Sequence, residues 1–220
     1  MTLTGKKPAQ ASAAPVPALE VRDLTFAYPG SAAPVLDHAS LAVPDGAFAL
    51  LTGATGSGKS TLLRLAKPEI APAGERAGEV FAFGTDVRSF LPAESAAAVG
   101  YVFQSPDNQI VCDTVWHEMA FGLENLGVPA DEMRRRVAET CNFFGMGPWF
   151  RAQTSELSGG QRQTLALAAT LAMRPRLLLL DEPTSMLDPI AEKAFLGLLF
   201  RANRELGITV VVATHAPQAM

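Results

Sequence analysis

The stretch Gly53-Ala54-Thr55-Gly56-Ser57-Gly58-Lys59-Ser60 decides the fold class of this 220-residue chain. It has the spacing G-x-x-x-x-G-K-[ST] of a phosphate-binding loop. It follows the apolar run Phe48–Thr52 and leads into a helix-like segment. Glycines allow a tight turn whose N–H groups point inward at phosphate oxygens. The complete motif between a strand and a helix therefore predicts a nucleotide site on an α/β fold, and not an ordinary glycine-serine turn.

Two further features of the sequence carry the chemistry that such a loop needs. Lys59 is placed to reach the β- and γ-phosphates, and the Ser60 hydroxyl is a ligand for Mg²⁺. The buried run Leu177–Leu180 ends in Asp181 and Glu182, and two adjacent carboxylates belong in the ligand crevice of an open α/β sheet and not in its core. We expect Asp181 to hold the metal and Glu182 to polarise the attacking water.

Around the loop, short apolar runs alternate with helix-like patterns. The predicted strands are Leu19–Phe26, Phe48–Thr52, Val99–Phe103, Leu177–Leu180 and Ile208–Thr214. Several are apolar on both sides, which is typical of strands covered on both faces. Helices are predicted after Gly58 and from Ser158 to Met173, the second one stopped by Pro175. The alternation predicts an α/β domain with a mainly parallel central sheet.

A helical insert interrupts this alternation, since no convincing strand pattern occurs between Ser105 and Leu157. We expect Thr114 to cap a helix that runs through Asn125, and Asp131 to cap the next. Their apolar stripes are Val115, Met119 and Leu123 in the first, and Met133, Val137, Cys141 and Phe144 in the second. The run Arg134–Arg136 is interpreted as a solvated polar face.

The composition of the chain argues against some classes of function. The net charge of −4 argues against a general nucleic-acid binder, which would carry a basic excess. Cys112 and Cys141 are expected to be separate reduced thiols. Residues 1–18 are predicted to be a disordered tail and not a signal peptide, because the Pro/Ala/Ser-rich stretch has no apolar region. No apolar run approaches the length of a membrane span.

The segment Leu157-Ser158-Gly159-Gly160-Gln161 separates this chain from other proteins with a phosphate loop. It predicts a second phosphate-binding helix start, capped by Ser158, and it resembles the LSGGQ signature of the ABC ATPases. The resemblance covers residues 19–220. It implies a P-loop NTPase (RecA-like) core with an antiparallel β edge and an inserted all-α signature subdomain. The core would be 19–104 with 162–220, and the helical subdomain 105–161.

The resemblance also assigns site residues. Tyr28 matches the aromatic residue that stacks on adenine, although a core or strand-edge tyrosine is the alternative. Gln104 matches the glutamine that contacts Mg²⁺ and the water, and His215 the histidine that contacts the γ-phosphate. Asp188, in Ser185-Met186-Leu187-Asp188, matches a loop that crosses a dimer interface. The expected nucleotide contacts are Tyr28, Gly53, Ala54, Thr55, Gly56, Ser57, Gly58, Lys59, Ser60, Thr61, Ser158, Gly159, Gly160, Gln161 and Asp188; the catalytic residues are Glu182, His215 and Gln104, and the metal-binding residues are Ser60, Gln104 and Asp181.

In this family two ATPase domains pack head to tail, and each ATP lies between the phosphate loop of one and the signature of the other. The resemblance therefore implies ATP and Mg²⁺ as cofactors, a second ATPase domain (an identical chain, a different chain or a tandem fusion), and transmembrane subunits at the cytoplasmic face of the membrane. The family normally continues past the position of Met220 with a further strand and helices, so a C-terminal part is expected to be missing here.

Within the family, Gln104–Gln109 and Ala120–Asn125 are similar to segments of energy-coupling-factor (ECF) ATPases, which power uptake of vitamins or transition-metal ions. In that group this region receives coupling helices of a transmembrane subunit. The side chains of Met119, Phe121 and Leu123 either contact that subunit or form a core stripe. The transported solute is not encoded here, and the course of residues 66–78 is left open by Lys67-Pro68-Glu69.

Two other functions are alternatives to a transport ATPase. A soluble ABC ATPase acting on nucleic acid or ribosomes usually shows long coiled-coil insertions, tandem domains or basic extensions, and none is visible in this sequence. A nucleotide-dependent assembly factor with little turnover would not need Glu182 and His215. The sequence therefore favours a transport ATPase.

Overall fold

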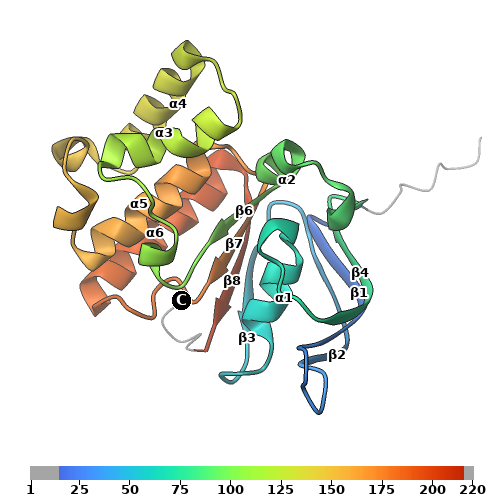
Figure 1. Ribbon diagram of the computed structural model, residues 1–220. Helices are drawn as coiled ribbons and strands as arrows, with labels where there is room; N and C mark the ends of the chain where they lie inside the picture. The colour runs from blue at the N-terminus through green and yellow to red at the C-terminus, as the bar shows by residue number, and fades with distance from the viewer. Residues whose placement is uncertain (1–14, 216–220) are drawn as a thin grey trace, which may run out of the picture.

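The computed structural model describes residues 15–215, and these form two four-stranded sheets with helices around them (Figure 1). The strands are β1 (Leu19–Ala27), β2 (Leu36–Val43), β3 (Phe48–Thr52), β4 (Glu75–Ala82), β5 (Thr85–Asp86), β6 (Val99–Val102), β7 (Leu177–Asp181) and β8 (Thr209–Thr214). The α-helices are α1 (Lys59–Leu65), α2 (Pro92–Ala98), α3 (Val115–Asn125), α4 (Ala130–Phe143), α5 (Gly159–Ala172) and α6 (Pro189–Leu206). Among these helices, none is both long enough and apolar enough to cross a membrane.

The central sheet is parallel, with strand order β3-β8-β7-β6. Every residue of β6, β7 and β8 is buried, which confirms the prediction of strands covered on both faces. Alternation along the strands assigns the two faces. Leu177 and Leu179 pack with α1 and the second sheet, whereas Leu178 and Leu180 pack with α3, α5 and α6. The parallel sheet is thus the middle layer of the core.

The second sheet is antiparallel, with strand order β2-β1-β4-β5. Of its strands, only β1 was among the runs predicted from the sequence. A shift in the β1–β4 register between Arg22 and Thr25 brings the chains close at Gly78, where φ is +82°. A Cβ at Gly78 would lie 2.3 Å from the carbonyl oxygen of Asp23, so this crossing requires glycine.

The helical insert contains α3 and α4, which Figure 1 shows stacked beyond the edge of the parallel sheet. Val115, Met119 and Leu123 are buried in the core, which identifies Met119 and Leu123 as a core stripe, while Phe121 is 42% exposed. Val137, Cys141 and Phe144 are also buried. The only pairing of extended backbone described between Ser105 and Leu157 is an isolated bridge of Thr114 with Gln153.

Of the two helix caps expected in this insert, the position of Thr114 is confirmed and that of Asp131 is wrong. Thr114 occupies the N-cap of α3, but its hydroxyl makes no capping bond and is buried without a partner. Pro129 is the N-cap of α4, and Asp131 lies in the first turn, where its carboxylate accepts from Arg134. The helix therefore begins earlier than a capping Asp131 would place it, and the acidic side chain lies instead in the first turn, where its charge interacts favourably with the helix dipole.

The two cysteines, the arginine run of α4 and the segment after α1 were also subjects of prediction. Cys112 and Cys141 are both free, as expected. Arg135 and Arg136 donate hydrogen bonds to Glu132, and these bonds lower the pKa of Glu132 to about 2. The side chains of Arg134 and Arg135 are largely exposed and that of Arg136 is partly buried, so most of the arginine run is solvated, as predicted. Of residues 66–78, the segment 66–74 contains one 3-10 turn, Pro68–Ile70, and residues 75–78 are the first half of β4.

The predicted tail falls mostly outside the described residues, which begin at residue 15. Ala18, the last residue of that segment, is buried, and its N–H donates to the Val43 carbonyl.

Candidate nucleotide site

A cleft of about 350 Å³ opens where the carboxyl ends of the parallel strands meet the phosphate loop. Its lining combines residues from the segment between β1 and β2, the loop, α1 and the segments after β6, β7 and β8, namely Tyr28, Val35, Thr55, Gly56, Gly58, Lys59, Ser60, Thr61, Gln104, Glu182 and His215. Ligands bind at this edge of open α/β sheets. The structure therefore brings most of the predicted nucleotide, metal and catalytic residues into one cleft.

The loop depends on glycine at two places in particular. Gly56 and Gly58 have φ of +82° and +87°, in the left-handed region. A Cβ at Gly58 would lie 2.8 Å from Leu36 Cδ2 and 2.9 Å from the Val35 carbonyl oxygen. A tightly wrapped glycine loop of this kind is the arrangement in which backbone amides bind anions.

Lys59 supplies the positive charge of the cleft. Its Nζ donates to the carbonyl oxygens of Gly53 and Ala54 at 2.9 and 3.0 Å, and lies 3.8 Å from Oε1 of Glu182. The lysine side chain is almost fully buried. A buried ammonium held at the mouth of a glycine loop is suited to phosphate oxygens.

Next to it, Ser60 and Asp181 form the expected metal-binding pair. Ser60 Oγ donates to Asp181 Oδ1 at 2.6 Å. The other carboxylate oxygen, Oδ2, accepts from the phenol of Tyr101 at 3.1 Å and lies 3.7 Å from a terminal nitrogen of Arg64. Burial and the Asp181 charge raise the pKa of Tyr101 well above its usual value, so the phenol keeps its proton and remains a donor.

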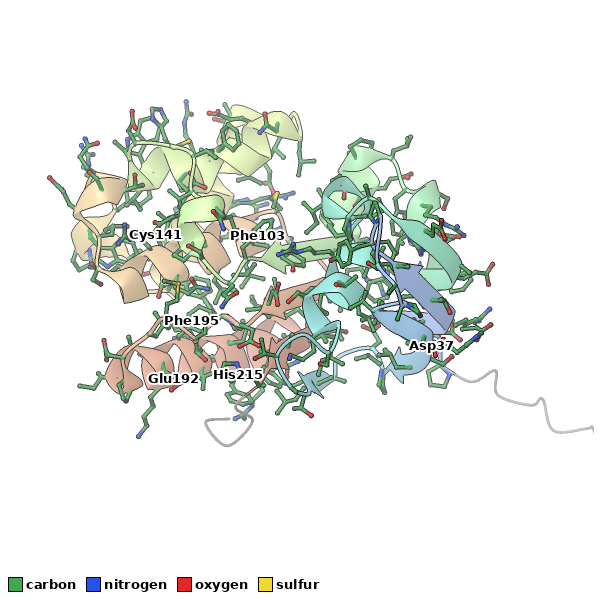
Figure 2. All side chains as sticks on the ribbon, turned by 60° about the horizontal axis from the view of Figure 1, so that its bottom comes forward. Asp37, Phe103, Cys141, Glu192, Phe195 and His215 are labelled. Atoms are coloured by element: carbon green, nitrogen blue, oxygen red, sulfur yellow. The ribbon has the colours of Figure 1, made fainter. Side chains whose placement is uncertain are left out.

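Glu182 follows in a strained backbone conformation. Its φ is +47°, which is uncommon for a residue with a side chain. Its N–H donates to the Ala213 carbonyl, which links it to β8. Nδ1 of His215, the residue after β8, is hydrogen-bonded to Glu182 Oε2. Figure 2 shows His215 beside the parallel sheet, away from Cys141 in the helical insert.

Gln104 reaches the same carboxylate residue through Ser185. Gln104 Nε2 donates to Ser185 Oγ at 3.3 Å, and that hydroxyl donates to the Glu182 carbonyl at 2.9 Å. Two glutamine side chains bind the backbone of the preceding residue, Phe103. Its N–H donates to Gln109, and its carbonyl oxygen accepts from Gln163 of α5. The loop that carries Gln104 is thereby tied to the signature helix.

Tyr28 forms one wall of the cleft. Its hydroxyl and Thr61 Oγ1 are 2.9 Å apart, and its ring packs edge-on against Phe26 with 5.1 Å between centroids. The side chain is 38% exposed, so part of the ring is available to a planar ligand. A flat aromatic surface next to a phosphate loop suits a nucleobase.

The signature residues stand apart from this cleft. Ser158 caps α5 by accepting from the Gln161 N–H, and Gln161 Oε1 accepts from the Ser158 N–H, so the two form a capping box. A Cβ at Gly160 would lie 3.0 Å from Ala191 of α6. None of Ser158, Gly159, Gly160 and Gln161 is among the described residues that line the cleft.

Asp188 has a clear local role. Its carboxylate accepts from the N–H groups of Ile190 and Ala191 and caps α6. It is also absent from the described lining of the cleft. Its expected contact across a dimer interface stays a prediction. Two apolar residues close to it in sequence, Met186 and Ile190, are 70% and 84% exposed.

Sequence reasoning missed Tyr101, Arg64 and Val35, and it named Ser185 only as part of Ser185-Met186-Leu187-Asp188, without its contact with Gln104. Tyr101 is paired with Leu179 across β6 and β7, so it lies on the same face as Asp181, two residues further along β7. The sequence shows only that Tyr101 lies in a predicted strand, and not that this strand pairs with the one that ends in Asp181. Arg64 lies in α1, one helical turn after Ser60 on the same helix. Val35 lies in no motif that the sequence analysis identified.

The donor set fits a nucleotide with a magnesium ion. A hydroxyl and a carboxylate oxygen, 2.6 Å apart, are hard oxygen ligands of the kind that Mg²⁺ prefers. The cleft also provides a cation, glycine amides and an aromatic wall. In the chemistry that these groups support, Lys59 and the loop would hold phosphates, and Glu182 with His215 would face the terminal phosphoryl group.

Comparisons with known proteins agree with this geometry. The family model described as ABC transporter matches residues 36–185. A putative ABC transporter ATP-binding protein of Bacillus anthracis is 48% identical over 196 residues, covering 89% of this chain and 36% of the relative. The chain thus spans about a third of that relative's length.

Two relatives are closer to this chain in length. The energy-coupling factor transporter ATP-binding protein EcfA1 of Symbiobacterium thermophilum is 45% identical over 207 residues, covering 90% of this chain and 71% of the relative. The solved structure of cbiO1 from Clostridium perfringens, described as part of the ABC transporter complex cbiONQ, has a TM-score of 0.79 and 31% identity, covering 90% of this chain and 78% of that one.

Proposed function

The chain belongs to the ABC transporter family of ATP-binding proteins, and on this premise we propose that it binds and hydrolyses MgATP in the cleft to power a membrane importer of the ECF type. The observation that carries the proposal is the convergence of Lys59, Ser60, Gln104, Glu182 and His215 on one cleft. The relatives named for energy-coupling-factor and cbiONQ complexes support the ECF type.

Binding would use the residues that already converge there. The loop amides and Lys59 would hold the β- and γ-phosphates, and Tyr28 would stack on adenine. Ser60, Asp181 and Gln104 would hold Mg²⁺, which when bound neutralises charge on the phosphates. Ser60 Oγ and Asp181 Oδ1 already face each other, so little rearrangement of these two side chains is needed.

Hydrolysis would depend on Glu182. Its carboxylate lies in the cleft, close to both Lys59 and His215. As general base it would take a proton from the attacking water. His215 would hold the carboxylate in place and face the γ-phosphate. The positive φ of Glu182 supports a functional role, because backbone strain of this kind clusters at active sites.

A second ATPase domain would complete the site. The signature residues Ser158–Gln161 form a second helix start, and none of them is among the described residues that line the cleft. We propose a head-to-tail pair in which the partner's signature closes over the ATP held by this chain. The exposed Met186 and Ile190, beside Asp188, would lie at that interface.

The transmembrane subunit would dock in a groove between α2, α3 and α5. This groove has a volume of about 680 Å³ and is lined by side chains that include Leu91, Phe121 and Met173. Leu91 is 65% exposed and Phe121 42%. A short apolar helix of a membrane subunit fits such a groove. The chain would then be peripheral at the cytoplasmic face of the membrane, and the solute, a vitamin or a transition-metal ion, would be chosen by other subunits.

One experiment tests the transport function as a whole. ATP hydrolysis by the chain, in its natural full-length context, is measured with its membrane subunits in detergent or nanodiscs, and separately with DNA, RNA or ribosomes. Stimulation by the membrane subunits and not by nucleic acid is the expected result. Stimulation by nucleic acid or ribosomes alone would contradict the importer function and favour a soluble ATPase.

A further inference from the structure

We propose that Tyr101 is a positioning residue for the metal site: its phenol fixes the carboxylate of Asp181 so that Oδ1 faces Ser60. The inference rests on the proposed function, because it assigns a role within the proposed MgATP site. The observation behind it is that the two oxygens of Asp181 have different hydrogen-bond partners, Ser60 for Oδ1 and Tyr101 for Oδ2.

The carboxylate sits where its orientation matters. The Asp181 side chain is 3% exposed, so bulk water cannot replace a lost partner. The Tyr101 phenol is the hydrogen-bond donor to Oδ2 among residues 15–215, since Arg64 lies 3.7 Å away, beyond hydrogen-bonding distance. Ligand carboxylates of metal sites are typically held in place by such outer partners. Without the phenol, Asp181 could turn and withdraw Oδ1 from Ser60.

Tyr101 is itself held rigidly. It is 6% exposed and lies in β6, which is paired with β7 from Val99 to Val102. Its ring packs edge-on against Phe103 with 4.9 Å between centroids. The phenol therefore reaches Asp181 from a fixed strand. A donor with this geometry can select one orientation of the carboxylate.

The same strand leads to Gln104, another expected metal-binding residue, three positions after Tyr101. Figure 2 shows Phe103, between these two, at the junction of the helical half and the strand-rich half of the molecule. β6 therefore carries the hydrogen-bond donor to Asp181 and leads directly to a second expected metal-binding residue.

The test measures metal binding and not turnover. The affinity of the full-length protein for a non-hydrolysable ATP analogue is measured by calorimetry in excess Mg²⁺ and again in EDTA, and the ratio of the two affinities gives the contribution of the metal. Tyr101→Phe removes only the hydroxyl. It is expected to lower that ratio by about 10- to 100-fold, the usual cost of losing an outer partner, while the affinity in EDTA stays at the wild-type value.

Two further variants serve as controls. Thr209→Val removes another buried hydroxyl, one that bonds Gly46 N and Asp45 at the opposite end of β8, and it should leave the ratio unchanged. Arg64→Met removes the nearby charge that makes no hydrogen bond to Asp181, and it should lower the ratio less than Tyr101→Phe does. The thermal midpoint of each variant confirms that it is folded.

The outcomes separate the two proposals. A wild-type ratio in Tyr101→Phe, an equal loss of affinity with and without Mg²⁺, or a larger effect of Arg64→Met would overturn the role of Tyr101 and leave the nucleotide site intact. A wild-type protein that binds the analogue in neither condition would overturn the proposed function itself.

Discussion

Nζ of Lys59 lies 3.8 Å from Oε1 of Glu182, and both side chains are largely buried. The phosphate-loop cation and the proposed general base therefore face each other directly across the cleft. A γ-phosphate that bound Lys59 would meet the Glu182 carboxylate at close range, and two negative groups in a poorly solvated site repel each other. The same contact that poises Glu182 for hydrolysis thus opposes tight ATP binding.

Glu182→Gln should separate these two effects. We expect hydrolysis to fall by roughly 10²–10⁴-fold, the usual contribution of general-base catalysis, while ATP affinity stays equal or increases because the repelling charge is gone. Single-turnover hydrolysis and equilibrium binding measure the two quantities. Hydrolysis at the wild-type rate would remove Glu182 from the mechanism.

Tyr28 should contribute to binding of the base and not of the phosphates. Tyr28→Ala is expected to weaken ATP binding by about 1–3 kcal/mol, the typical value of stacking between a base and an aromatic side chain. Tyr28→Phe keeps the ring and should lose much less. Binding of inorganic triphosphate, which has no base, should be the same in all three proteins. An equal loss for triphosphate would mean that Tyr28 acts through Thr61 and the loop.

Two aromatic residues of α3 offer a matched test of the docking groove. Phe121 and Trp116 are each 42% exposed, but Phe121 lines the groove between α2, α3 and α5, whereas Trp116 lines a different groove between α3 and α4. Phe121→Glu should abolish co-purification with the membrane subunits and leave nucleotide binding intact. Trp116→Glu should affect neither. The reverse pattern would move the docking surface to the α3–α4 groove.

The parts of the fold that sequence predicted are those with strong local signals. The runs of Leu177–Leu180 and Ile208–Thr214 are short and mostly apolar on both faces, which favours a strand covered on both faces. β2 and β4 could not be predicted from the sequence because many of their residues are exposed. Their sequences, LDHASLAV and ERAGEVFA, mix charged and small residues and show no clear apolar alternation. Their pairing is set by contact with β1, which local sequence does not encode.

The candidate site divides in the same way. The loop, the acidic strand end and the signature are contiguous motifs, so their residues could be named in advance. The partners that orient them could not, because Tyr101 and Asp181 are 80 positions apart and meet only through strand pairing. The structure adds that the Asp188 carboxylate caps α6, while its expected contact with the nucleotide at a dimer interface stays a prediction.

The β1–β4 crossing supplies a prediction about stability. Gly78 and Gly46 both have left-handed φ, +82° and +74°, but only at Gly78 would a Cβ collide with backbone. Gly46→Ala should cost about 1–2 kcal/mol, the left-handed penalty alone. Gly78→Ala should cost about 1–3 kcal/mol more, because the strands must move apart. Urea unfolding measures both, and equal losses would show that the crossing relaxes freely.

The most direct test of the central claim is calorimetric titration of MgATP into Lys59→Ala in its full-length, monomeric form, beside Lys193→Ala and Ser158→Arg. Lys193 is an exposed lysine of α6 and controls for loss of charge. Because Lys59 faces the cleft and Ser158 lies outside it, Lys59→Ala should abolish tight binding, while Lys193→Ala and Ser158→Arg keep it. Unchanged affinity in Lys59→Ala, or loss of binding in monomeric Ser158→Arg, would contradict the assignment of this cleft as the chain's own ATP site.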